Sequence, residues 1–86
     1  MSSPEDSRMR IKKPALVVTF STAAEAMKME KYCLARNLPG RLIPTPQEIS
    51  AGCGLAWKAP EDARERLVSA MTEGEIHWED ARVLTI

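Results

Sequence analysis

The chain has 86 residues, 44% of them hydrophobic and only 5% aromatic, so it has the size of one small domain with a mainly aliphatic core. Its 12 basic and 12 acidic residues balance, but four cations and only two carboxylates fall within residues 1–13. The remainder is therefore slightly acidic, which disfavours nucleic acid as a partner. No apolar run approaches the length of a membrane span and no apolar leader precedes the domain, so we expect a cytoplasmic protein without a membrane partner.

Residues 1–13 combine serines, a proline and mixed charges without any hydrophobic period. This pattern predicts a disordered tail, followed by a single domain over residues 14–86. The domain opens with Ala15–Phe20, an apolar and largely β-branched run. Such a run is typical of a strand that is covered on both faces, so we expect an interior strand here.

The first helix is predicted to be capped by Ser21 or Thr22. Thr22 and Glu25 have the spacing of a capping box in which the glutamate reaches back to the cap N–H. The helix should run to about Asn37 and be stopped by Leu38–Gly40. Cys33 falls on the apolar side of this helix and is most simply a core residue. The residues that define that side at helical spacing are Ala23, Ala26, Met27, Cys33 and Leu34.

A short second strand is predicted over Arg41–Pro44, and it should lie at a sheet edge or end at Pro44, because proline has no N–H for a ladder. Residues 46–50 have the start-of-helix pattern of a single helical turn. After a glycine-rich loop, Leu55–Lys58 alternates in polarity. This alternation places Leu55 and Trp57 on one face of a half-buried strand.

A second helix is predicted from Pro60 to Gly74, followed by a last strand within residues 75–86 that is broken near Glu79–Asp80. The inner stripe of this helix consists of Ala63, Leu67, Ala70 and Met71. The element order is then β-α-β-β-α-β. Two split βαβ units in this order give a ferredoxin-like α+β sandwich, a four-stranded antiparallel sheet with two helices on one face.

Cys53 stands between Gly52 and Gly54, which leave its sulfur accessible and allow the backbone a positive φ. This setting indicates a presented thiol, and an incidental loop cysteine is the alternative. Cys33, Cys53 and the single histidine, His77, are too few ligands for a structural zinc site in a monomer. Two cysteines also do not indicate a disulfide framework. We therefore expect no metal and no cofactor.

A thiol attacks as its thiolate, so the groups around Cys53 decide its reactivity. The predicted turn over residues 46–50 would direct its partly negative C-terminal end at the sulfur, which disfavours the thiolate. Activation would then need loop N–H groups or a cation such as Arg41 or Lys58. Glu30, near the middle of the first helix's apolar side, needs a partner such as these cations or faces the cysteine loop, unless it escapes to solvent at the helix edge.

The segment Arg41-Leu-Ile-Pro-Thr-Pro-Gln-Glu-Ile-Ser50, followed by Cys53-Gly-Leu-Ala56, resembles the signature of a small bacterial family of selenium/sulfur carrier-like proteins. The resemblance extends to Phe20–Thr22 and to the helix that contains Glu30, and it covers roughly residues 14–78.

The resemblance implies that Cys53 is a carrier thiol whose loop is shaped by Pro44, Pro46, Ser50 and Gly54 together with Gly52. Ala51 stands where the family often has a serine. Cys33 stands where an aliphatic residue is more usual, which agrees with a core position.

The leading hypothesis is a cytoplasmic carrier that accepts sulfur or selenium on Cys53 from a donor protein and passes it to an acceptor protein. It would act stoichiometrically through a covalent adduct rather than as a turnover enzyme. An alternative is a non-catalytic interaction or ligand-sensing module that dimerises through a sheet face or an edge strand. A third reading is metal binding by the Cys53 thiols of two protomers.

Overall fold

The computed structural model describes residues 13–46, 49 and 54–85. The predicted tail therefore lies almost entirely outside the described residues. The elements in chain order are β1 (Pro14–Thr19), α2 (Ala23–Ala35), β2 (Arg41–Pro44), β3 (Leu55–Pro60), the short 3-10 helix η1 (Glu61–Ala63), α3 (Arg64–Glu73) and β4 (Asp80–Thr85).

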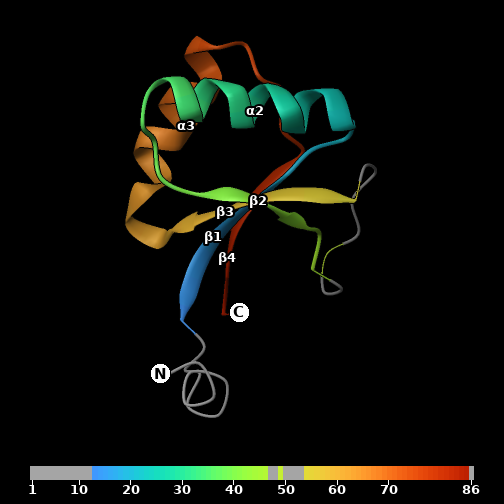
Figure 1. Ribbon diagram of the computed structural model, residues 1–86. Coiled ribbons are helices and arrows are strands. Elements are labelled where there is room, and N and C mark those ends of the chain that lie inside the picture. Colours follow the sequence, from blue (N-terminus) through green and yellow to red (C-terminus); the bar gives the residue numbers. More distant parts are fainter. Residues whose placement is uncertain (1–12, 47–48, 50–53, 86) are drawn as a thin grey trace, which may run out of the picture.

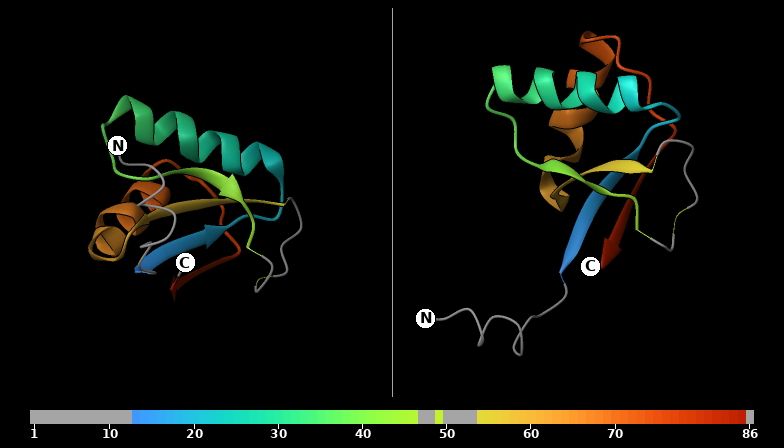
Figure 2. Two further views of the ribbon diagram at one scale, coloured as in Figure 1. Left: turned by 60° about the horizontal axis from the view of Figure 1, so that its bottom comes forward. Right: turned by 45° about the vertical axis from the view of Figure 1, so that its right-hand side comes forward.

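The four strands form one antiparallel sheet in the order β2-β3-β1-β4, and both helices cover the same face of it (Figures 1 and 2). The predicted ferredoxin-like α+β fold is thereby confirmed. β1 is an interior strand, as expected from its apolar run, and all of its residues from Ala15 to Thr19 are buried. β2 is an edge strand, as its closing proline predicted.

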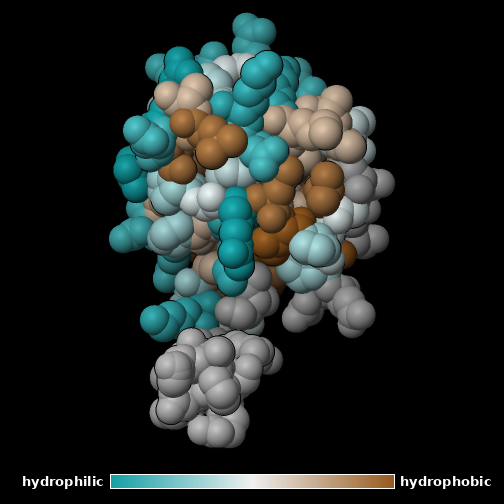
Figure 3. Space-filling model, viewed as in Figure 1, coloured by the Kyte–Doolittle hydropathy of each residue, from teal (hydrophilic) through white to brown (hydrophobic). Residues whose placement is uncertain are grey.

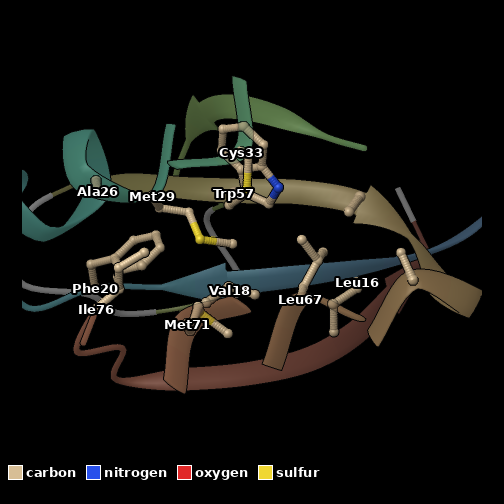
Figure 4. Packing of buried hydrophobic residues seen from close by; sticks show 12 residues of the cluster. Leu16, Val18, Phe20, Ala26, Met29, Cys33, Trp57, Leu67, Met71 and Ile76 are labelled. Atoms are coloured by element: carbon tan, nitrogen blue, oxygen red, sulfur yellow. The ribbon is translucent and has the colours of Figure 1, made fainter. Parts of the chain in front are cut away.

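The core fills the space between the sheet and the two helices (Figure 4). Its two largest members are Trp57 of β3 and Phe20 directly after β1, and Met29 of α2 packs with them; all three are almost completely buried. Burying a large apolar side chain stabilises a fold by about 1.5–3 kcal/mol, so this layer supplies most of the driving force. The other members are Leu16, Val18, Ala26, Cys33, Ala59, Ala63, Leu67, Met71 and Ile76.

The inner side of α2 differs from the prediction. Its buried residues are Ala26, Met29 and Cys33, which follow i, i+3, i+7 spacing. Met29 was not predicted there, and three predicted residues are exposed instead: Ala23, Met27 (60%) and Leu34 (71%). The helix carries two interleaved apolar stripes, and packing on the sheet selected the one that admits Met29. Figure 3 shows hydrophobic residues reaching the surface in patches separated by hydrophilic ones.

The capping box at the start of α2 is only half formed. The hydroxyl of Thr22 accepts from the N–H of Glu25 at 3.3 Å, as predicted. The Glu25 carboxylate does not return to the cap; it accepts from the N–H of His77 at 2.9 Å. This bond, together with nearby Lys28, lowers the pKa of Glu25. The glutamate therefore ties the start of α2 to the segment that leads into β4.

α2 ends at Ala35, slightly earlier than predicted. Asn37 has a φ of 55°, and the N–H of Leu38 donates to the carbonyl of Cys33 at 2.9 Å. These are the features of a Schellman motif, in which a residue in the left-handed region closes the helix. The stop therefore comes from Asn37, one residue before the predicted Leu38–Gly40.

The segment before β4 is not a strand, contrary to the prediction. Glu75 has a φ of 56°, and the N–H of Ile76 donates to the carbonyl of Met71 at 2.9 Å, so a second Schellman motif follows α3. Ile76 is buried at 2% exposure as part of this motif. β4 begins only at Asp80, after the N–H of Glu79 donates to the carbonyl of Thr19 at 2.7 Å.

Trp57 fixes the position of the segment that leads into β2. Its indole Nε1 donates to the carbonyl of Pro39 at 3.1 Å, and its backbone pairs with Leu42. Gly40 makes this packing feasible, because it has a φ of 119° and lies against the indole. A Cβ at this position would overlap Trp57 Nε1 and lie 2.7 Å from the carbonyl oxygen of Lys58.

We predict that Gly40→Ala lowers the free energy of unfolding by about 3 kcal/mol or more, because steric overlap with the indole adds to backbone strain. Gly54→Ala is the matched control. It has a φ of 76°, but its Cβ would meet nothing within 4 Å, so only the backbone cost of about 1 kcal/mol applies. Urea unfolding monitored by Trp fluorescence measures the loss of unfolding free energy in each variant. Equal losses in the two variants would contradict this role of Gly40.

Candidate functional site

The loop between β2 and β3 is held at both of its ends. Pro44 pairs with Leu55 at the end of the ladder, and the N–H of Thr45 donates to the carbonyl of Gly54 at 2.9 Å. Gly54 has the positive φ that the sequence predicted for it. The residue that follows Cys53 in the sequence is therefore fixed to the edge strand by backbone contacts.

Ile49 attaches the middle of this loop to the sheet. Its N–H donates to the carbonyl of Pro46 at 3.0 Å, and its side chain is only 8% exposed. It packs with Val17 and Ala56 on the sheet face opposite the helices. A small second core thus forms beneath the loop, and Ile43 and Leu84 border it. This role of Ile49 was not predicted, although an isoleucine in a polar loop is a signal for such an anchor.

In the part of the chain that the structure describes, two buried hydroxyl groups near the loop have no hydrogen-bond partner. They are the Oγ1 atoms of Thr19, which is 1% exposed, and Thr45. Thr19 and Ile43 flank Ala56 from either side in the sheet register, and Thr45 follows two residues after Ile43. Both threonines therefore lie at the end of the sheet where the loop leaves it. An unsatisfied buried hydroxyl costs about 1–3 kcal/mol, so each of these groups would be stabilised by a further hydrogen-bond partner at that end.

The predicted site residues fall into two sets. Pro44, Pro46 and Gly54 lie in the described part of the loop; Pro46 is half-buried, whereas Pro44 and Gly54 are exposed. The other predicted members, Ser50, Gly52 and Cys53, lie outside the described residues, as does most of the helical turn predicted over residues 46–50.

The structure brings Arg41 and Lys58 together but places Glu30 elsewhere. Arg41 and Lys58 are direct cross-strand partners, on the sheet face turned away from the helices. Lys58 lies four residues beyond Gly54, which corresponds to roughly 13 Å along the strand. Glu30 is half-buried on α2, in the helical layer across the sheet.

Cys33 is a core residue, as predicted. Its side chain is 1% exposed, it is not part of a disulfide, and its sulfur is directed from α2 into the main core (Figure 4). Burial raises the pKa of this thiol from 9.0 to about 11. A thiol that is both sealed and protonated at neutral pH is a poor nucleophile.

This pKa predicts how stability depends on pH. The thiol of Cys33 ionises more readily in the unfolded chain, so its contribution to the free energy of unfolding is constant below about pH 9 and is lost as the pH rises towards 11. In a Cys53→Ser background, we expect the unfolding free energy to fall more steeply over this range than in the same background with Cys33→Ala. Urea titrations at a series of pH values measure the difference. Parallel pH profiles would contradict a raised pKa at Cys33.

Among the described residues, no group of three or more His, Cys, Asp or Glu side chains is arranged to hold a metal ion. None of the helices in that part of the chain is long and apolar enough to cross a membrane.

Neither a curated protein nor a solved structure matches the chain. A family match covers residues 15–81, which include both halves of the β2–β3 hairpin, its loop and the start of β4. The family is described as "Putative Se/S carrier protein-like", in agreement with the resemblance found in the loop sequence. The chain therefore belongs to the Se/S carrier-like family.

Proposed function

We propose that this protein carries sulfur or selenium atoms on the thiol of Cys53, as a persulfide or a selenopersulfide. One observation carries the proposal: of the two cysteines in the chain, Cys33 is sealed in the core with its pKa raised to about 11. Carrier chemistry that uses a thiol of this protein therefore depends on Cys53. Membership of the Se/S carrier-like family supports the same choice.

The loading step is a thiol exchange that needs no external oxidant. The Cys53 thiolate attacks the terminal sulfur of a donor persulfide, R–S–SH. A new S–S bond forms at Cys53, the donor's S–S bond breaks, and the donor leaves as the thiolate R–S⁻. The terminal sulfur keeps its proton and its oxidation state. A selenopersulfide donor, R–S–SeH, reacts in the same way, and attack on the adduct by an acceptor thiolate unloads it.

The hairpin supports such a step by holding the loop on a fixed scaffold. Gly54 is bonded through its backbone carbonyl to Thr45, and Ile49 is packed on the sheet. The unpartnered hydroxyls of Thr19 and Thr45 lie at the same end of the sheet. Hydroxyl groups donate hydrogen bonds to anionic sulfur, so either one is suited to stabilise the adduct after its terminal S–H or Se–H group has lost its proton.

The remaining residues of the proposed site have supporting roles. Pro44, Pro46, Ser50 and Gly52 shape the loop together with Gly54. Arg41 and Lys58 contribute positive potential on the same sheet face as Ile49. The partners are a donor protein and an acceptor protein, and the reducing cytoplasm is the compartment in which a free thiol persists.

Incubation with a small-molecule persulfide tests the proposal. We expect intact-mass spectrometry to show one added sulfur atom on the wild-type chain and none on Cys53→Ser. Cys33→Ala is the matched control, because it removes the other cysteine and leaves the loop unchanged, so it should load fully. Reduction by a thiol should return each loaded chain to its starting mass.

Loading at Cys33, or no loading of a folded wild-type chain, would overturn the carrier function. Full cellular function in Cys53→Ser would instead support the non-catalytic interaction module.

A further inference from the structure

We infer that the sheet face opposite the helices docks an acidic surface of a partner protein, through Arg41, Lys58 and Arg82. The inference deepens the proposed function, because the partner would be the protein that delivers or receives the chalcogen atom. The strand register places the three cations in one row. Arg41 pairs with Lys58, and Val17 pairs with Lys58 on one side and with Arg82 on the other.

This face differs in charge from the rest of the described molecule. Its strands contribute three cations, and Asp80 is the one carboxylate among them. The other eight described carboxylates lie on the helices, which Figure 1 shows on the far side of the sheet, or in the segment before β4. A slightly acidic domain thus presents one positive face, and this face is also where the loop is anchored by Ile49.

Two of these cations lack an acidic partner. Neither Arg41 nor Lys58 forms an ion pair with a carboxylate among the described residues. Like charges placed directly opposite each other on neighbouring strands repel and are destabilising. Arg82, in contrast, is held in place by Asp80, with its Nε 2.7 Å and its Nη2 2.5 Å from the Oδ2 atom. A partner carboxylate beside Arg41 and Lys58 would relieve their repulsion.

The width of the row favours a protein surface over a small ion. The row crosses four strands, and neighbouring strands lie about 4.8 Å apart, so Arg41 and Arg82 are separated by roughly 14 Å. One small anion cannot contact both ends of such a row.

Two other occupants fit the face less well. RNA would require exposed rings for base stacking, but all four aromatic side chains belong to the helix-side core or pack against it. The chain's own residues 1–12 carry three cations and two carboxylates, so they do not complement the face either.

Binding of a short poly-L-glutamate peptide at low salt tests the inference, with Cys53→Ser as the reference chain so that thiol chemistry is absent. We expect NMR shift changes to centre on Arg41, Lys58 and Arg82, and affinity to fall about tenfold in Arg41→Glu/Lys58→Glu. The matched control is Lys31→Glu/Arg66→Glu, which makes the same net charge change on exposed residues of α2 and α3 and should retain its affinity. If Arg41→Glu/Lys58→Glu misfolds, Arg41→Gln/Lys58→Gln replaces it and should show a smaller loss of affinity for the peptide.

Three outcomes would overturn the inference. They are equal losses in the two double variants, equally tight binding of poly-U RNA at the same face, and self-association of the unliganded chain through this face. The test is separate from the carrier function. Persulfide loading without peptide binding would reject only the docking face, and peptide binding without loading would reject only the carrier role.

Discussion

The burial of Trp57 is the contact on which the arrangement of the cysteine loop depends. Its ring fills the core beneath the helices, its indole N–H holds the carbonyl of Pro39, and Gly40 provides the space for both. These contacts set the edge strand β2 against β3. Once that register is fixed, Thr45 meets Gly54 and closes the base of the loop. A residue of the main core therefore determines where the loop begins and ends.

Successive side chains of β3 point to opposite faces of the sheet, and the two faces have different surroundings. Trp57 and Ala59 point into the main core, whereas Ala56 and Lys58 belong to the opposite face with Ile49. The core side encloses Cys33 and keeps its thiol protonated by burial. The loop on the hairpin contains Cys53, beside a face that is positively charged. Burial of Cys33 leaves Cys53 as the thiol on which the proposed carrier chemistry depends.

Much of the fold follows from local chemistry that is visible in the sequence. The β-branched run of β1 and the terminal proline of β2 each predicted the correct strand and its correct place in the sheet. The alternation of β3 predicted the strand but only half of its burial, because β3 is interior and both Ala56 and Trp57 are buried. Predictions that depend on tertiary choice were less successful. Met27 and Met29 lie on two different apolar stripes of α2, and only packing on the sheet selects Met29. Glu25 has the capping-box spacing, but its carboxylate accepts a hydrogen bond from the backbone N–H of His77, which lies far away in the sequence.

The loop was predictable from the sequence, whereas the contacts around it were not. The Pro-x-Pro and Gly-Cys-Gly patterns identify the loop. Proline restricts the backbone and glycine permits conformations that other residues rarely adopt, and both residue types are visible in the sequence. The anchoring of Ile49 and the free hydroxyls of Thr19 and Thr45 depend on which strands become neighbours. The same is true of the pairing between Arg41 and Lys58, which are far apart in the sequence until the hairpin forms.

The central claim is that the fold presents one thiol and seals the other within the same molecule. Peptide-resolved alkylation of the native chain by iodoacetamide, followed over time at neutral pH, tests it most directly. We expect Cys53 to be modified at least as fast as a thiol in a simple peptide, and Cys33 to be modified only when denaturant unfolds the chain. Comparable rates for the two cysteines in the folded protein, or faster modification of Cys33, would contradict it.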